Sequence, residues 1–151
     1  GDLFVVKNVG NIVPPPSQST DGLSSDAAIE FAVSALHVID IVVCGHSQCG
    51  AMTALLQPPN PDMPYLSRWL TIANPVKKIV EESYTHLTEV EDRITAAAEE
   101  NVLFALENLR AYPSVAEALL CGTIRLHGWF FKISSGELFI YRPQQQQFVK
   151  I

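Results

Sequence analysis

The sequence predicts an α/β protein in which a mostly parallel sheet is flanked by helices and ends in an antiparallel hairpin. Three observations carry this prediction. Short β-branched runs such as Ile41–Cys44 are typical of buried parallel strands. Segments with apolar residues at helical spacing lie between such runs. Near the C-terminal end, Ser-Ser-Gly at 134–136 joins two strand-like segments and indicates a hairpin.

Length and composition set the limits on function. The 151 residues are one domain's worth, so we expect a single domain over 1–151 with a real core. With 48% hydrophobic and 17% charged residues, the composition does not favour disorder. The net charge of -6 argues against a nucleic-acid partner. No apolar run reaches the roughly 18 residues of a membrane span, so no membrane partner is expected.

Two further features concern the redox compartment of the protein and the start of the sequence. Its three cysteines are odd in number and do not form a disulfide framework, which predicts a reducing compartment. The sequence begins at Gly1-Asp2, directly against a strand-like run and without an initiator methionine. We therefore expect a piece of a longer chain, or a processed one.

The first part of the chain reads as a strand followed by a loop. Leu3–Val6 is a short apolar run that predicts a buried strand. In the segment 7–11, Asn8 and Gly10 suit a tight loop where the backbone can approach a ligand closely. An ordinary turn is the more common outcome for such residues. The stretch 14–22 is polar and Pro-rich, which indicates a surface excursion.

A helix and a second strand come next. Ser-Ser-Asp at 24–26 offers N-cap residues for a helix running to about residue 38. The run 41–44 then predicts a strand, and a helix is expected over 50–56. This order of elements favours a right-handed parallel crossover between 3–6 and 41–44.

The rest of the chain is mostly helical before it ends in strands. Apolar spacing, prolines at helix starts and a glycine at a helix end define these elements. The expected helices are 66–73, 76–84, 91–109 and 113–120, the expected strands are 124–133 and 138–141, and 144–147 is a short polar run.

The candidate site is the turn between the strand at 41–44 and the following helix. It holds His46 and Cys49, whose imidazole and thiolate can both reach one ion at about 2.0–2.3 Å, as zinc requires. The turn also lies at the carboxyl end of a strand, where open α/β sheets bind ligands. One His and one Cys are only half a site, so spacing alone leaves metal binding and a structural role equally weighted. Cys44 is the alternative ligand, but a buried structural cysteine is the more common reading.

Six blocks of sequence carry a family resemblance: Gly1–Asn11, Val42–Met52, Glu100–Val102, Leu106–Arg110, Tyr112-Pro113 and Leu126–Trp129. Together they resemble the β-class carbonic anhydrases of bacteria and cyanobacteria, essentially from end to end. The resemblance implies a zinc enzyme that interconverts carbon dioxide and bicarbonate, with subunits that pair as homodimers or larger assemblies. It implies that His46 and Cys49 are zinc ligands, and we assign Asn8, Gly10 and Gly50 to the substrate pocket.

The chain also departs from the family pattern. The family takes a third zinc ligand from a Cys-x-Asp-Ser-Arg block whose Asp–Arg pair orients the reacting oxygen, and that block belongs upstream of Gly1. The catalytic residues are therefore unknown here, and one central strand, between 3–6 and 41–44, is expected to be missing. Lys7 and Val9 stand where the family usually has Arg and Ala. We expect weak zinc binding and impaired activity from the chain as given.

Three functional hypotheses follow from the residues and the resemblance. The first is a carbonic anhydrase with an incomplete sequence, and the second is a non-catalytic family member that serves as an assembly or scaffold subunit. The third, a thiol-redox or metal-sensing module on Cys44 and Cys49, is disfavoured because no Cys-x-x-Cys is present. A cytoplasmic location is expected, with the carboxysome or an organelle stroma as alternatives. We also expect His46 and Cys49 to face a common cleft beside the loop 8–11, with Cys44 turned away.

Overall fold

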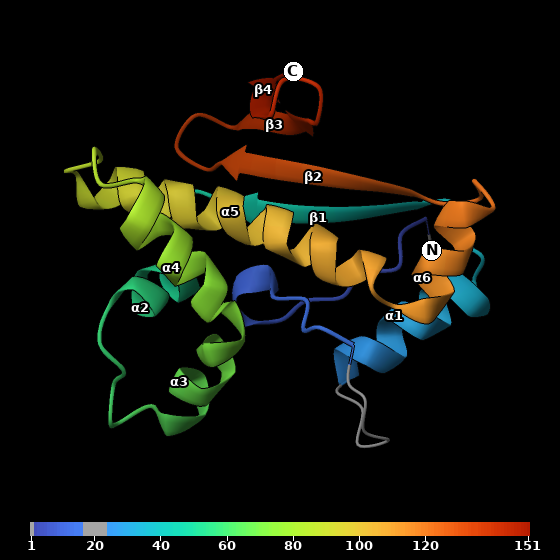
Figure 1. The fold of residues 1–151 in the computed structure, drawn as a ribbon, viewed down its shortest axis with the longest axis horizontal. Coiled ribbons are helices and arrows are strands. Elements are labelled where there is room, and N and C mark those ends of the chain that lie inside the picture. The colour runs from blue at the N-terminus through green and yellow to red at the C-terminus, as the bar shows by residue number, and fades with distance from the viewer. Residues whose placement is uncertain (1, 17–23) are drawn as a thin grey trace.

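The computed structural model describes residues 2–16 and 24–151. Gly1 and most of the polar excursion predicted over 14–22 therefore lie outside the described residues. One described strand stands among the helices in the sequence and the other three follow the last helix, and the sheet lies on one side of the helices (Figure 1).

One mixed sheet contains all the described strands, in the order β1-β2-β3-β4. β1 (Asp40–His46) pairs in parallel with β2 (Arg125–Lys132), while β3 (Glu137–Arg142) and β4 (Gln147–Lys150) continue the sheet antiparallel. The predicted α/β class and C-terminal hairpin are confirmed. Parallel pairing is confined to β1 and β2 within the described residues.

β4 was not predicted, because the sequence before it reads only as a polar run. The chain turns back after Arg142, and Gln146 takes a left-handed φ of 52° just before the strand starts. Phe148 on β4 then stacks edge-on against Phe130 of β2. A strand of four residues with two apolar side chains is too short to show an alternating pattern.

The prediction of a strand at Leu3–Val6 is wrong. The segment forms no strand, and all four side chains are exposed, from 46% for Phe4 to 82% for Leu3. The physical reason is the lack of a partner, since β1 pairs with β2 alone among the described strands and so forms an edge of the sheet. The expected parallel crossover between 3–6 and 41–44 is therefore not formed.

The helices match the prediction closely, with one exception. The first helix was expected to reach residue 38 but ends at Ser34, because the chain turns at His37 with a φ of 52°. Proline occupies the first turn of three helices, where its missing N–H costs nothing. The elements are η1 (Val9–Asn11), α1 (Ser24–Ser34), α2 (Gly50–Leu56), α3 (Pro64–Leu70), η2 (Thr71–Ala73), α4 (Asn74–Ser83), α5 (Val90–Arg110) and α6 (Pro113–Leu120).

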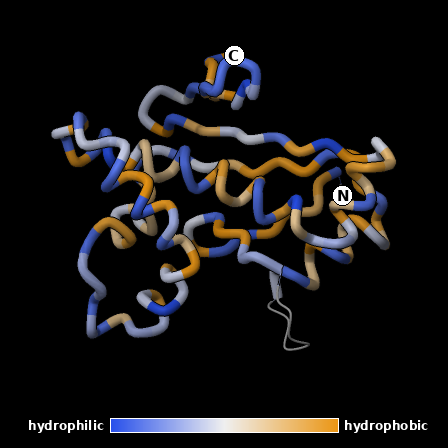
Figure 2. The backbone as a smooth tube through the Cα atoms, viewed as in Figure 1, coloured by the Kyte–Doolittle hydropathy of each residue, from blue (hydrophilic) through white to orange (hydrophobic). Residues whose placement is uncertain are grey.

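The long helix α5 packs against β1 and β2 and organises the core (Figure 1). Hydrophobic and hydrophilic residues are mixed along this helix (Figure 2), and its buried residues recur at helical spacing, as in other amphipathic helices. Two glycines permit its close approach, because a Cβ on Gly45 or Gly128 would lie 2.9 or 3.0 Å from the side chain of Val102. Any larger residue at either strand position would push the helix away.

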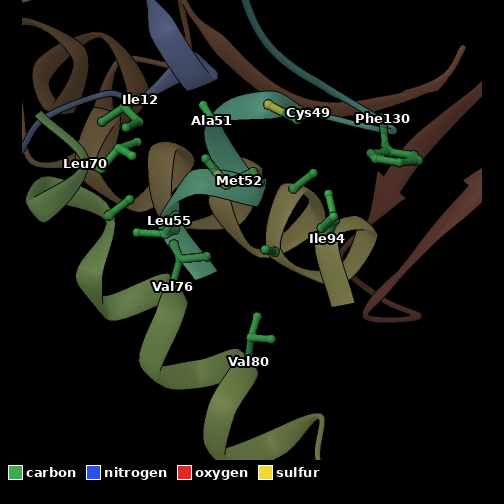
Figure 3. Close-up of a cluster of buried hydrophobic side chains, with 13 residues drawn as sticks. Ile12, Cys49, Ala51, Met52, Leu55, Leu70, Val76, Val80, Ile94 and Phe130 are labelled. Atoms are coloured by element: carbon green, nitrogen blue, oxygen red, sulfur yellow. The ribbon is translucent and has the colours of Figure 1, made fainter. Parts of the chain in front are cut away.

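A second part of the core joins α5 to α2 and α4. Met52, Val76 and Val80 are completely buried there, and Figure 3 shows them on the facing sides of α2 and α4. Cys49 belongs to the same cluster, at the start of α2 (Figure 3). The turn that carries the candidate site is therefore continuous with a well-packed core.

The backbone from Val9 to Pro14 is held by side chains from distant helices. Each bond joins a side-chain donor to a main-chain carbonyl, so the path of this segment is fixed by tertiary contacts. The bonds run from Trp69 Nε1 to Val9 O (2.8 Å), Asn101 Nδ2 to Gly10 O (2.9 Å), Asn108 Nδ2 to Val13 O (2.8 Å) and Tyr112 Oη to Pro14 O (3.0 Å).

Candidate metal site

The predicted site forms a tight turn between β1 and α2. His46 is the last residue of β1, and Cys49 occupies the N-cap position of α2. Between them, Gln48 adopts a left-handed φ of 56°, a conformation that non-glycine residues seldom take. The two candidate ligands are thus separated by one sharp reversal of the chain.

The His46 ring makes a hydrogen bond that selects its donor atom for a metal. Its Nδ1 lies 2.8 Å from the carbonyl oxygen of Ser47, and a carbonyl can only accept. In the neutral ring this bond assigns the proton to Nδ1 and leaves the lone pair on Nε2. A histidine fixed in this way by a backbone carbonyl is the usual arrangement among metal-binding histidines.

Cys49 offers a thiol that is only 4% exposed. Its main-chain carbonyl accepts the amide of Thr53 at 2.9 Å and the Thr53 hydroxyl at 3.0 Å, which fixes the backbone at the start of α2. Cysteine sulfur and imidazole nitrogen are both donors that zinc prefers. By donor chemistry alone, these two side chains are of the types that zinc binds.

A complete set of ligands is not found in the part of the chain that the structure describes. No three His, Cys, Asp or Glu side chains within 2–16 and 24–151 form a group that could hold a metal ion. Cys44 lies on the exposed side of β1, yet neighbouring atoms desolvate its sulfur and raise the pKa of its thiol. That shift disfavours the thiolate that a metal would need.

The residues assigned to the substrate pocket occupy different environments. Asn8 closes its own loop, donating from Nδ2 to the Ile12 carbonyl (2.8 Å) and accepting the Ile12 amide on Oδ1 (2.9 Å). Gly10 has a φ of 79°, and a Cβ there would lie 2.9 Å from the Ala51 side chain. A Cβ on Gly50 would meet nothing within 4 Å. η1 contacts both β1 and α2, but a common cleft with His46 and Cys49 stays a prediction.

A cavity of about 580 Å³ lies beside the turn and was not predicted. Ser47 and Gln48 line it together with acidic residues of α5, among them Glu99. Burial, reinforced by the neighbouring Glu100, raises the pKa of Glu99 to about 7. The one signal in the sequence is the pair of glutamates after three alanines, which reads as an ordinary helix surface.

An exposed ion-pair cluster lies at the other end of β1. The guanidinium of Arg125 donates twice to the Asp40 carboxylate, each time at 2.8 Å. His127 Nε2 lies 2.7 Å from the same carboxylate. These bonds lower the pKa of Asp40 to about 2. Asp40 begins the strand that His46 ends, so the cluster is separate from the candidate metal site.

Comparison with known sequences gives a consistent result. The family profile described as carbonic anhydrase matches residues 1–138. A carbonic anhydrase of Synechocystis is 41% identical over 151 residues, which is 99% of this chain and 54% of the relative. Carbonic anhydrase 1 of Escherichia coli is 44% identical, over 97% of this chain and 65% of the relative. The chain thus spans about half to two thirds of the length of these relatives.

Solved structures show the same likeness. The beta-carbonic anhydrase CcaA superposes on the whole chain with a TM-score of 0.93 and 40% identity, and 73% of CcaA is covered. A tetrameric beta-carbonic anhydrase of Sordaria macrospora gives a TM-score of 0.83 at 32% identity, over 93% of this chain and 68% of that protein.

Among the described helices, none is long and apolar enough to cross a membrane.

Proposed function

Because this chain belongs to the β-carbonic anhydrase family, we propose that it serves the zinc-dependent, reversible hydration of carbon dioxide to bicarbonate. The β1–α2 turn is the observation that supports the proposal, since it holds the two residues that we propose as metal donors, His46 at the end of β1 and Cys49 at the start of α2. When bound, zinc supplies a water activated for attack on carbon dioxide. In this proposal Asn8, Gly10 and Gly50 border the substrate.

The same proposal includes low activity of the 151-residue chain. Two donor side chains are present, and a Cys-x-Asp-Ser-Arg block, with its ligand and its Asp–Arg pair, does not occur in the sequence. A zinc site normally has three or four protein ligands. Zinc affinity should therefore be low, and the reacting oxygen should lack the orienting carboxylate of that Asp–Arg pair.

Assembly into a homodimer or larger homo-oligomer is part of the proposal. Val42 and Phe131 lie on the sheet positions that point away from the core and are 41% and 38% exposed. Apolar surface of this kind is typical of obligate subunit interfaces. The tetrameric Sordaria relative supports the same inference. A reducing compartment such as the cytoplasm, a carboxysome or an organelle stroma suits the three free cysteines.

A second candidate function is a non-catalytic assembly or scaffold subunit. The observation that favours it is the missing third donor within residues 2–16 and 24–151. Such a subunit would keep the family fold and its contacts while binding no zinc. Metal content and turnover, measured on the same preparation, separate the two candidates.

The deciding experiment compares the 151-residue chain with a chain extended by an N-terminal segment that contains Cys-x-Asp-Ser-Arg. Stopped-flow hydration of carbon dioxide and metal analysis are run in parallel on both. We expect much less than one zinc per subunit and slow turnover in the short chain, and a gain of both in the extended one. In the extended chain His46→Ala should abolish both, while His86→Ala, in the turn after α4, should not. Zinc at one per subunit and equal turnover in both chains would contradict the proposal.

A further inference from the structure

Ser47 stands between the two candidate ligands, and each of its three polar groups makes a hydrogen bond. Its amide donates to the carbonyl of Phe131 at 3.0 Å. Its hydroxyl oxygen accepts the amide of Ile133 at 2.9 Å. Its carbonyl accepts Nδ1–H of His46 at 2.8 Å. One residue thus joins the end of β2, the β2–β3 turn and the His46 ring.

The side chain of Ser47 contributes one particular link in this set. β1 and β2 pair in register up to His46 and Phe131, so the ladder itself ends there. The Ser47 hydroxyl continues the connection beyond the ladder, to the amide of Ile133. Ser47 is only 8% exposed, so water competes little for these bonds. The hydrogen bond from the Ile133 amide to the Ser47 hydroxyl therefore helps to fix the backbone at Ser47. It thereby helps to fix the direction of the Ser47 carbonyl that accepts the His46 bond.

We propose that Ser47 is a positioning residue that holds the His46 imidazole in one orientation, with Nδ1 protonated and Nε2 kept as the donor atom. The metal-binding consequence rests on the proposed function, whereas the tautomer is a property of the metal-free chain. Residues that orient a metal-binding histidine typically change metal affinity by about 10- to 100-fold when they are removed. The hydroxyl of Ser47 acts through the peptide and does not itself touch the metal.

The first test measures the His46 ring directly in the metal-free 151-residue chain. Nitrogen-15 NMR of the ring should show a single tautomer with the proton on Nδ1. In Ser47→Ala the hydroxyl is gone, and the ring should become a mixture of both tautomers. The Ile133 amide should also exchange with solvent faster. Ser47→Thr keeps the acceptor oxygen and should restore both signals.

The second test titrates the same variants with cobalt, a spectroscopic substitute for zinc. Ser47→Ala should bind cobalt about 10- to 100-fold more weakly than the parent chain, and Ser47→Thr should recover the affinity. Ser135→Ala is the matched control, because it removes a serine hydroxyl bonded to Glu137 in the adjacent hairpin. It should leave cobalt affinity and the tautomer unchanged.

The outcomes separate this inference from the proposed function. A parent chain with the proton on Nε2 overturns the positioning role, whether or not Ser47→Ala folds. An unchanged tautomer and unchanged cobalt affinity in a folded Ser47→Ala overturn it as well. A 151-residue parent chain that binds neither cobalt nor zinc agrees with the weak metal binding in the proposed function, and the tautomer comparison then decides the role of Ser47. The proposed function is contradicted if the chain extended with Cys-x-Asp-Ser-Arg binds no metal, whatever the tautomer of His46.

Discussion

Two short apolar runs, Ile41–Cys44 and Leu3–Val6, have similar compositions, but only the first forms a strand with a buried side. The first lies within β1, hydrogen-bonded to β2, with Val43 buried beneath α5. The second forms no strand, and its side chains are exposed. Both runs contain the β-branched residues that strands favour. The difference shows that a paired neighbour, rather than composition, makes the strand.

The exposure of Leu3–Val6 continues to Val9, which is 55% exposed, and ends by Ile12, which is completely buried. Trp69 and Asn101 hold the carbonyls of Val9 and Gly10, a few residues further along. Phe4 still contacts Phe31 of α1, with ring centroids 5.9 Å apart. The run Leu3–Val6 therefore contacts α1 through Phe4 but pairs with none of the described strands.

The largest expected effect comes from breaking the packing that β1 has and Leu3–Val6 lacks. Gly45→Val would place new atoms where even a Cβ lies 2.9 Å from Val102 and 3.1 Å from the Ala98 carbonyl. We expect a loss of more than about 3 kcal/mol in the free energy of unfolding, because the backbone of α5 must move. Urea unfolding followed by circular dichroism measures this loss.

Gly50→Ala is the matched control for Gly45→Val. Its new Cβ meets nothing within 4 Å, and it begins α2, where alanine is favourable. The unfolding free energy should change by less than about 0.5 kcal/mol. Equal losses in the two glycine variants would show that the contact between β1 and α5 does not limit stability.

The second effect concerns Asn101, whose side chain holds the backbone at Gly10, just after the exposed segment. Asn101 is completely buried, and its amide donates to Gly10 O. Asn101→Ala should cost about 2–3 kcal/mol, because it removes this bond and leaves a small cavity. Limited proteolysis should then cut within residues 8–14. Asn108→Ala removes a similar bond to Val13 from a less buried position and should cost about 1 kcal/mol.

The sequence predicted those elements whose cues are local. The helices at 50–56 and 113–120 were predicted at the bounds observed, because the cues for each lie within or beside the segment, such as the proline at the first turn of 113–120. The strand at 3–6 was wrongly predicted because pairing is a long-range property. β4 was missed for a related reason, since its stability comes from β3 and from the contact between Phe148 and Phe130.

In the candidate site, too, the sequence predicted the residues with local cues and missed the long-range contacts. His46 and Cys49 were found from a four-residue spacing, and the structure places them at the two ends of one turn. The contact between Ser47 and Ile133 spans 86 positions, and the bond from Asn101 to Gly10 spans 91. A single sequence carries no signal for contacts of that separation. The arrangement around the ligands therefore had to come from the structure.

A smaller effect is expected at Glu99, in the cavity beside the end of β1. Its pKa is raised to about 7 from an ordinary value of 4.5, so the folded protein holds this proton more tightly than the unfolded chain. The stability from the protonated form is complete below about pH 4.5 and is lost as the pH rises through about 7. Glu99→Gln should therefore be more stable than the parent at pH 8, by about 1–2 kcal/mol after allowance for partial solvation.

Thermal unfolding of Glu99→Gln and the parent between pH 4 and pH 8 tests this sign. The two curves should meet near pH 4 and separate as the pH rises. Glu107→Gln, on the exposed side of the same helix, should follow the parent at every pH. A Glu99→Gln variant that is less stable than the parent at pH 8 would show that the ionised carboxylate is favoured in the fold.

The smallest effect is expected inside the exposed run itself, and it sharpens the comparison most directly. Val5 is 61% exposed, so Val5→Asp should change the unfolding free energy of the 151-residue chain by less than about 0.5 kcal/mol. If an added N-terminal segment supplies the strand that Leu3–Val6 lacks, the same substitution in the extended chain should cost more than about 1 kcal/mol, because its side chain then packs in a paired strand. Urea unfolding of the four proteins gives both differences. An equal cost in the two chains would mean that the added segment leaves Leu3–Val6 unpaired.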